Sequence, residues 1–73
     1  MKVYGYSKNG GDILQDMEEI TLRCNASELR AIASLILKCA NNKNWEHLHL
    51  QDEWEGWVEN MTDVIIQNPN KSN

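Results

Sequence analysis

The stretch of residues 25–43 constrains this chain more than any other, because nearly every local signal in it predicts an α-helix. Its apolar residues at helical spacing form one stripe: Leu29, Ile32, Ala33, Ile36 and Ala40. Asn25 can cap the first turn, and Glu28 three residues later completes a capping-box pattern. An amphipathic helix of this kind needs an apolar surface to cover, and we expect the rest of the chain to provide it.

Alternation of apolar and polar residues predicts short strands on both sides of this helix. The predicted strands are residues 2–7, 19–24, 46–51 and 63–67. The last of them contains Val64, Ile65 and Ile66, a run that suits a buried strand. Residues 13–17 fit either a hairpin or a short helical turn, and residues 52–61 fit a loop or a short helix. The order strand, strand, helix, strand, strand predicts an α+β fold, an antiparallel sheet of about four strands with the helix on one face.

The length of 73 residues suits one small domain, and we expect residues 1–73 to form it, with a frayed polar tail at 70–73. A chain of this size buries only about 60% of its unfolded surface, which leaves little room for a deep active-site cleft. The sequence contains no Walker loop, G-x-S-x-G element or dinucleotide fingerprint. We therefore expect no enzymatic activity and no cofactor.

The two cysteines indicate the compartment. Cys24 and Cys39 are fifteen positions apart, and a helix between them would separate them by roughly 22 Å, against a limit of about 7 Å for a disulfide. The N-terminus has no apolar leader, and no run approaches the roughly 18 apolar residues of a membrane span. Two unpaired thiols fit a reducing compartment, so we expect a cytoplasmic protein without membrane contact.

The charges are unevenly distributed. The formal net charge is −4, which argues against nucleic-acid binding because that function needs a basic face. Residues 1–43 hold six Lys or Arg against five acids, whereas residues 44–70 hold six acids and no Lys or Arg. This asymmetry favours a surface adapted to a basic partner, although a solvated face that aids solubility is the plain alternative.

All three tryptophans lie in the acidic part of the chain. Tryptophan is enriched at the energetic centres of interfaces, and carboxylates around it would steer a basic partner. A chain without phenylalanine must also build its core from large residues, so we assign Trp45 to the core. Trp54 and Trp57 fit the core and an interface equally well.

Two histidines at alternate strand positions allow a metal site as a further alternative. His47 and His49 would share one strand face about 7 Å apart, and Asp52 or Glu46 could add a carboxylate ligand. An exposed strand face has the same pattern, and we prefer that interpretation, with no metal bound.

Three pieces of the sequence, in order along nearly the whole chain, carry a family resemblance. They are residues 1–6, residues 27–33 with 37–40, and residues 47–52 with 63–69. Together they resemble the immunity protein 32 family, small bacterial immunity proteins of polymorphic toxin systems. The resemblance implies a non-enzymatic protein that neutralises, by direct binding, a toxin encoded beside it. Many toxin domains of such systems are nucleases with basic substrate grooves, which an acidic, tryptophan-bearing face would occlude.

The sequence thus predicts an immunity protein that binds its cognate toxin through one acidic, aromatic segment. The predicted toxin-binding residues are Asp52, Glu53, Trp54, Glu55, Trp57 and Glu59. The alternative function is a small structural or regulatory module that forms a homodimer by pairing an exposed sheet edge across a two-fold axis. We expect the helix itself to take no part in recognition, since its stripe faces the sheet and Arg30, Ser34 and Lys38 form a mixed outer surface.

Overall fold

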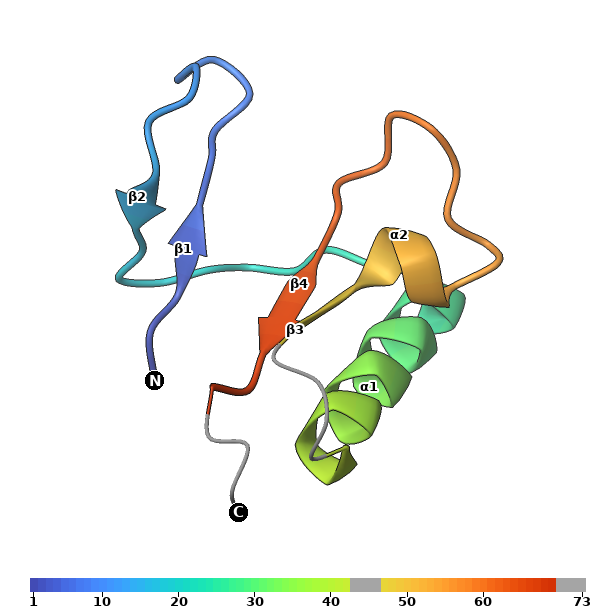
Figure 1. Ribbon diagram of the computed structural model, residues 1–73. Helices are drawn as coiled ribbons and strands as arrows, with labels where there is room; N and C mark the ends of the chain where they lie inside the picture. Colours follow the sequence, from blue (N-terminus) through green and yellow to red (C-terminus); the bar gives the residue numbers. More distant parts are fainter. Residues whose placement is uncertain (43–46, 70–73) are drawn as a thin grey trace.

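The computed structural model describes residues 1–42 and 47–69, in which strands and helices follow one another as Figure 1 shows. The elements are β1 (Tyr4–Gly5), β2 (Gln15–Asp16), α1 (Ala26–Asn41), β3 (His47–His49), α2 (Leu50–Glu53) and β4 (Ile65–Gln67). One main helix and antiparallel strand pairs confirm the predicted α+β class. The predictions about Trp45, Glu46 and the tail at 70–73 lie outside the described residues.

Helix α1 begins where the sequence predicts. The Asn25 side chain accepts a hydrogen bond from the Glu28 backbone N–H at 2.8 Å, and the Glu28 carboxylate accepts one from the Asn25 N–H at 2.8 Å. Both bonds of a capping box are therefore present, and they satisfy two backbone donors that the first turn would otherwise leave unpaired.

The buried face of α1 differs from the predicted stripe. The buried residues are Ile32, Leu35 and Cys39, whereas Leu29 and Ile36 are about half exposed. Both sets have helical spacing and share Ile32, so periodicity alone does not choose between them. The choice is made by what the helix packs against, namely β3, β4 and α2. There Cys39 donates a hydrogen bond from its thiol to the Ile66 carbonyl, with the sulfur 3.4 Å from the oxygen.

Two separate two-stranded sheets replace the predicted sheet of four strands. Strand β1 pairs antiparallel with β2, and β3 pairs antiparallel with β4 so that Leu48 lies opposite Ile66. Residues 19–24 were predicted as the second strand, and that prediction is wrong. The turn around Gly11, which has a φ of 64°, returns the chain so that residues 15–16 reach β1 first, through a shorter loop. The hairpin alternative for residues 13–17 is therefore the one observed.

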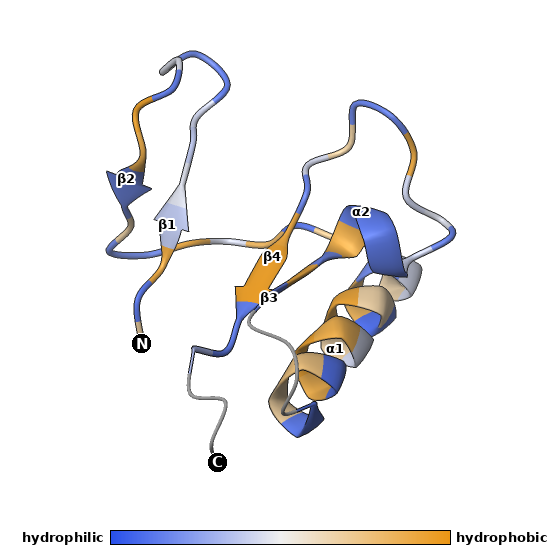
Figure 2. Cartoon of the chain, viewed as in Figure 1, coloured by the Kyte–Doolittle hydropathy of each residue, from blue (hydrophilic) through white to orange (hydrophobic). Residues whose placement is uncertain are grey.

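The core lies between α1 and the second sheet. Its buried members are Ile32, Leu35, Cys39, Leu48 and Leu50. The predicted alternation of Leu48 and Leu50 holds, although Leu50 already belongs to α2. Strand β4 is not buried on both faces as its sequence suggested, because Ile66 is half-buried while Ile65 is largely exposed. Figure 2 shows the apolar residues of β3 and β4 beside those of α1.

The hairpin β1–β2 stands apart from this core (Figure 1). Its large apolar side chains are all at least one-third exposed: Tyr4, Tyr6, Ile13, Leu14 and Met17. Cys24 and Cys39 are both free thiols, one at the start of α1 and one in the core. Among the described residues, no helix is long and apolar enough to cross a membrane.

Candidate functional site

The acidic segment, residues 52–59, starts in α2 and continues through tight turns. The Trp54 N–H donates to the Leu50 carbonyl at 3.0 Å, and the Trp57 N–H donates to the Trp54 carbonyl at 3.1 Å. Just beyond the segment, Asn60 adopts a left-handed conformation with a φ of 77°, which asparagine tolerates better than most residues. Of the two predicted structures for residues 52–61, a short helix and a loop, the chain uses both in succession.

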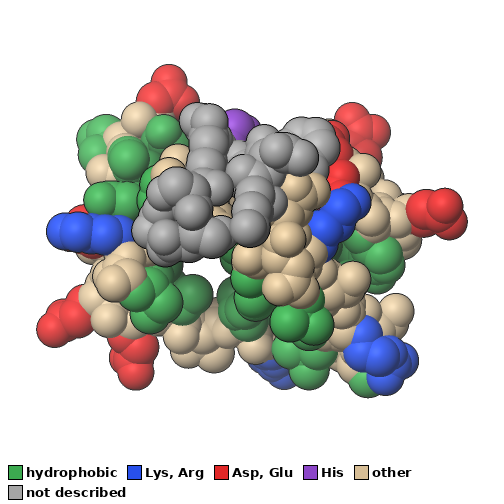
Figure 3. Space-filling view, turned by 60° about the horizontal axis from the view of Figure 1, so that its bottom comes forward, with side chains coloured by type: hydrophobic (Ala, Val, Ile, Leu, Met, Phe, Trp, Pro, Cys, Tyr) green, Lys and Arg blue, Asp and Glu red, His purple; other side chains and the backbone are tan. Residues whose placement is uncertain are grey.

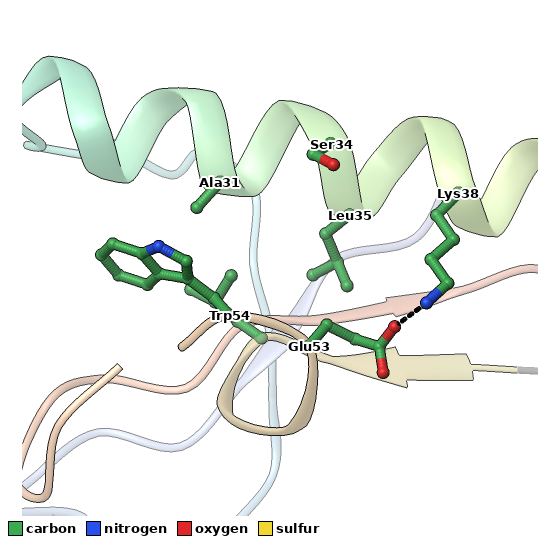
Figure 4. A pocket seen from close by; sticks show the side chains of 7 residues that line it. Ala31, Ser34, Leu35, Lys38, Glu53 and Trp54 are labelled. Carbon is green, nitrogen blue, oxygen red and sulfur yellow. Dashed lines mark hydrogen bonds and ion pairs between the residues drawn. The ribbon is translucent and has the colours of Figure 1, made fainter. Parts of the chain in front are cut away.

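Trp54 is fixed between the core and the surface. Its indole is half-buried, packs against the core and lines a small cavity of about 170 Å³ with Ala31 and Leu35 of α1 (Figure 4). Gly56 also lies close to the indole. A Cβ added at Gly56 would stand 2.6 Å from two ring carbons of Trp54. The ring is therefore held in place by the helix and by a glycine that leaves it room.

Trp57 is held in a similar way by its polar end. Its Nε1–H donates a hydrogen bond to the Thr62 carbonyl at 3.3 Å, and its half-buried ring packs against the core. Sequence reasoning left core and interface open for both tryptophans. In the structure each side chain contributes to the core and still presents part of its surface to solvent.

The four carboxylates of the acidic segment differ in their surroundings. All four belong to exposed residues, and Glu53 forms an ion pair with Lys38 of α1 (Figure 4). Lys38 therefore connects the two helices and is not the ordinary outer residue that the sequence suggested. Within the described part of the chain, no ion pair engages Asp52, Glu55 or Glu59. On the face drawn in Figure 3, the carboxylates lie toward the margin, and Lys or Arg side chains lie among them.

A second polar constellation joins His49 to Asp63. One Asp63 oxygen lies 2.9 Å from His49 Nδ1, and the other accepts backbone N–H bonds from Gln51 at 2.9 Å and Val64 at 3.0 Å. Burial acts to raise the pKa of Asp63, but the hydrogen bonds and the charge interaction with His49 outweigh it and hold the pKa below its ordinary value. No sequence pattern predicts that these two residues pair. The register of β3 with β4 brings them together, since His49 lies opposite Ile65.

This constellation bears on the alternative of a metal site. The rings of His47 and His49 meet edge to face with centroids 5.3 Å apart, which is closer than the roughly 7 Å expected from the spacing of alternate strand residues. The carboxylate beside His49, however, is Asp63 and not Asp52. Among residues 1–42 and 47–69, no three His, Cys, Asp or Glu side chains are grouped so that they could hold a metal ion.

A comparison with known protein families assigns the chain. The family model described as immunity protein 32 matches residues 19–69. This chain belongs to the immunity protein 32 family. The matched range contains α1, the sheet of β3 and β4, and the acidic segment, whereas most of the hairpin β1–β2 precedes it. No curated protein and no solved structure matches the chain. The family implies a toxin as the protein partner, and the resemblance noted in the sequence is confirmed.

Proposed function

We propose that this immunity protein neutralises a cognate toxin by binding it directly through the acidic segment, without chemistry of its own. One observation supports the proposal above the others. Trp54 and Trp57 pack against the core and are partly exposed, and Asp52, Glu55 and Glu59, which are interleaved with them in the sequence, are exposed and form no ion pair in the described chain. A binding surface combines these two features, whereas a purely solvated face needs no tryptophan.

The physical argument has two parts. A tryptophan that is already fixed loses little conformational freedom when a partner covers it, so more of its buried area appears as affinity. Carboxylates without ion pairs attract a basic surface over distances of about 10 Å and accelerate encounter. The partner that fits is a toxin with a basic surface or active site, for example a nuclease groove. We further propose that residues 1–73 act as one domain in the cytoplasm, which suits the two free thiols.

The test uses the toxin domain encoded beside this chain, with affinity measured calorimetrically and protection measured by co-expression. Glu55→Lys should weaken binding by about tenfold or more, because it places a cation against a basic surface. Asp12→Lys is the matched control, since it changes the net charge equally at an exposed site in the hairpin turn. Equal losses for the two variants would show that only net charge matters and would contradict the proposed surface.

The tryptophans need a variant that keeps both indole side chains. Trp54→Ala and Trp57→Ala should reduce protection, but both also remove packing from the core. Gly56→Ala keeps every charge and both indoles while it forces the Trp54 ring from its position. We expect all three variants to protect less well at unchanged secondary structure by circular dichroism. Full protection by all three variants would mean that the toxin binds to a different surface of the protein.

Self-association remains the second candidate, and the exposed apolar hairpin favours it. A hairpin of two strands is marginally stable alone, so the hairpin of one copy could be covered by another. Light scattering at several concentrations separates the two functions. A monomer that binds the neighbouring toxin supports the first, and a stable dimer without toxin binding supports the second.

A further inference from the structure

An apolar groove lies beside the acidic segment, between the extended chain that precedes α1 and the chain that precedes β4. Its volume is about 380 Å³, which is within the range of about 300–1,000 Å³ found for ligand pockets. One side is formed by residues 21–24 and the other by Met61, Thr62 and Val64. The buried residues Ile32 and Leu50 lie at its base, and Trp54 lines it as well.

On the side formed by the extended chain, backbone hydrogen-bonding groups have no partner in the described part of the chain. Residues 18–23 run almost straight from the hairpin toward α1 (Figure 1), and they make no backbone hydrogen bond with any residue that the structure describes. Their apolar side chains are only partly covered, since Ile20 and Leu22 are each 50% exposed. The alternation of apolar and polar residues predicts a strand at residues 19–24. The segment has the pattern of a strand, and no strand of the described chain lies paired beside it.

We propose that a strand of the toxin docks in this groove by pairing with residues 18–23. Strand addition uses main-chain hydrogen bonds for affinity and side-chain pockets for specificity, and the groove offers both an unpaired edge and an apolar base. The proposal rests on the proposed function and extends it: the tryptophan and carboxylates of the acidic segment then lie beside the docked strand, with Trp54 common to both surfaces.

Charge indicates which kind of strand fits. The charged residues that line the groove are Arg23 and Glu28, and Glu28 is engaged in the capping box. The segments that contribute its two sides, residues 18–24 and 52–63, contain seven acids and a single basic residue, Arg23. Glu53 and Asp63 are engaged by Lys38 and His49. The remaining acids make these flanking segments negative, so we expect the complementary strand to alternate apolar residues with Lys or Arg.

The decisive variant is Leu22→Arg, with Ile20→Arg as its matched control. Both residues belong to the same segment and are 50% exposed, but only Leu22 lines the groove. Leu22→Arg should weaken binding to the neighbouring toxin domain by about thirtyfold, the usual loss at an interface hot spot, and Ile20→Arg by less than about threefold. Thermal unfolding of the free variants shows whether either one has lost its fold.

Amide hydrogen exchange of the unaltered chain gives a second measurement, which does not depend on any variant. Strand pairing should slow the exchange of residues 18–23 when the toxin domain is bound. If the toxin binds while these amides remain unprotected and the two Arg variants bind equally, the docked strand is wrong and the proposed function stands. If the toxin does not bind at all, both are wrong. If Leu22→Arg instead dissociates a dimer, the groove holds a second copy and the toxin strand is wrong.

Discussion

Asp63 shows how one side chain can hold together the part of the molecule that carries the acidic segment. One of its oxygens accepts hydrogen bonds from the backbone N–H groups of Gln51, in α2, and Val64, just before β4, and the other lies against Nδ1 of His49 at the end of β3. These are the two points where the chain enters and leaves the loop that contains the acidic segment. A carboxylate that receives several donors is stabilised in its charged form, which is why its pKa is lowered despite burial.

We expect Asp63→Ala to lower the free energy of unfolding by about 1–3 kcal/mol at pH 7, because it leaves these donors without their acceptor. Asp52→Ala is the control, since Asp52 is exposed and its change should stay within about 0.5 kcal/mol. Urea unfolding measures both. A loss no larger for Asp63→Ala than for Asp52→Ala would show that the carboxylate does not secure the loop.

The pH dependence follows from the direction of the shift. Because the folded pKa of Asp63 lies below the unfolded value, near 3.8, its contribution is complete above that pH. The contribution is lost as the pH falls below 3.8 and through the folded pKa. The difference in stability between the unaltered chain and Asp63→Ala should therefore shrink in urea unfolding below about pH 4. A constant difference from pH 7 to pH 3 would contradict this.

At the scale of one element, two variants of α1 test which of its two apolar stripes is buried. Leu35 is 2% exposed and its neighbour Ile36 is 45% exposed, although the sequence favoured Ile36. Leu35→Ala should cost about 2–5 kcal/mol, as for other large-to-small core substitutions, and Ile36→Ala less than about 1.5 kcal/mol. Chemical denaturation measures the stability lost by each variant. A larger loss for Ile36→Ala would mean that the predicted stripe, and not the observed one, is buried.

The start of α1 supplies a further prediction at this scale. Asn25→Ala removes the cap and should destabilise the domain by about 0.5–2 kcal/mol. Ser27→Ala is a fitting control in the same first turn, because Ser27 is exposed and makes no side-chain hydrogen bond in the described part of the chain. Thermal unfolding of both variants checks the cap, and equal midpoints would argue that the capping box contributes nothing.

The whole molecule is less closely packed than its length suggests. Its radius of gyration is 13.0 Å, against about 11 Å for a compact chain of 73 residues. The hairpin accounts for part of this, because strands β1 and β2 contact one another far more than any other element. The family match begins at residue 19 and so sets the hairpin largely aside as well.

Hydrogen exchange of the free protein should therefore differ between the hairpin and the core. Amides of β1 and β2 should exchange at least about tenfold faster than those of α1 and β4, because opening the hairpin exposes little buried surface. Mass spectrometry of peptides from residues 1–18 and 26–41 measures the two regions side by side. Equal protection would mean that the hairpin and the core open together.

The acidic segment shows which features of the candidate site can be predicted from local sequence patterns. The tryptophans and acids could be named from the sequence, because composition and charge are properties of the chain itself. Glu53 pairs with Lys38, and Trp54 lies against Ala31 and Leu35. Both depend on contacts between residues at least fifteen positions apart in the sequence. No spacing rule anticipates such contacts.

The sequence by itself determined the span of α1, its capping box and the α+β class, since these follow from interactions within a few residues. Only the tertiary structure decided which stripe of α1 is buried, that the strands form two sheets, and that residues 18–23 pair with no strand among the residues described. The physical reason is the same in each case. Two arrangements satisfied the local pattern equally, and the choice between them was made by non-local packing against α1 and by the shorter closure of the hairpin.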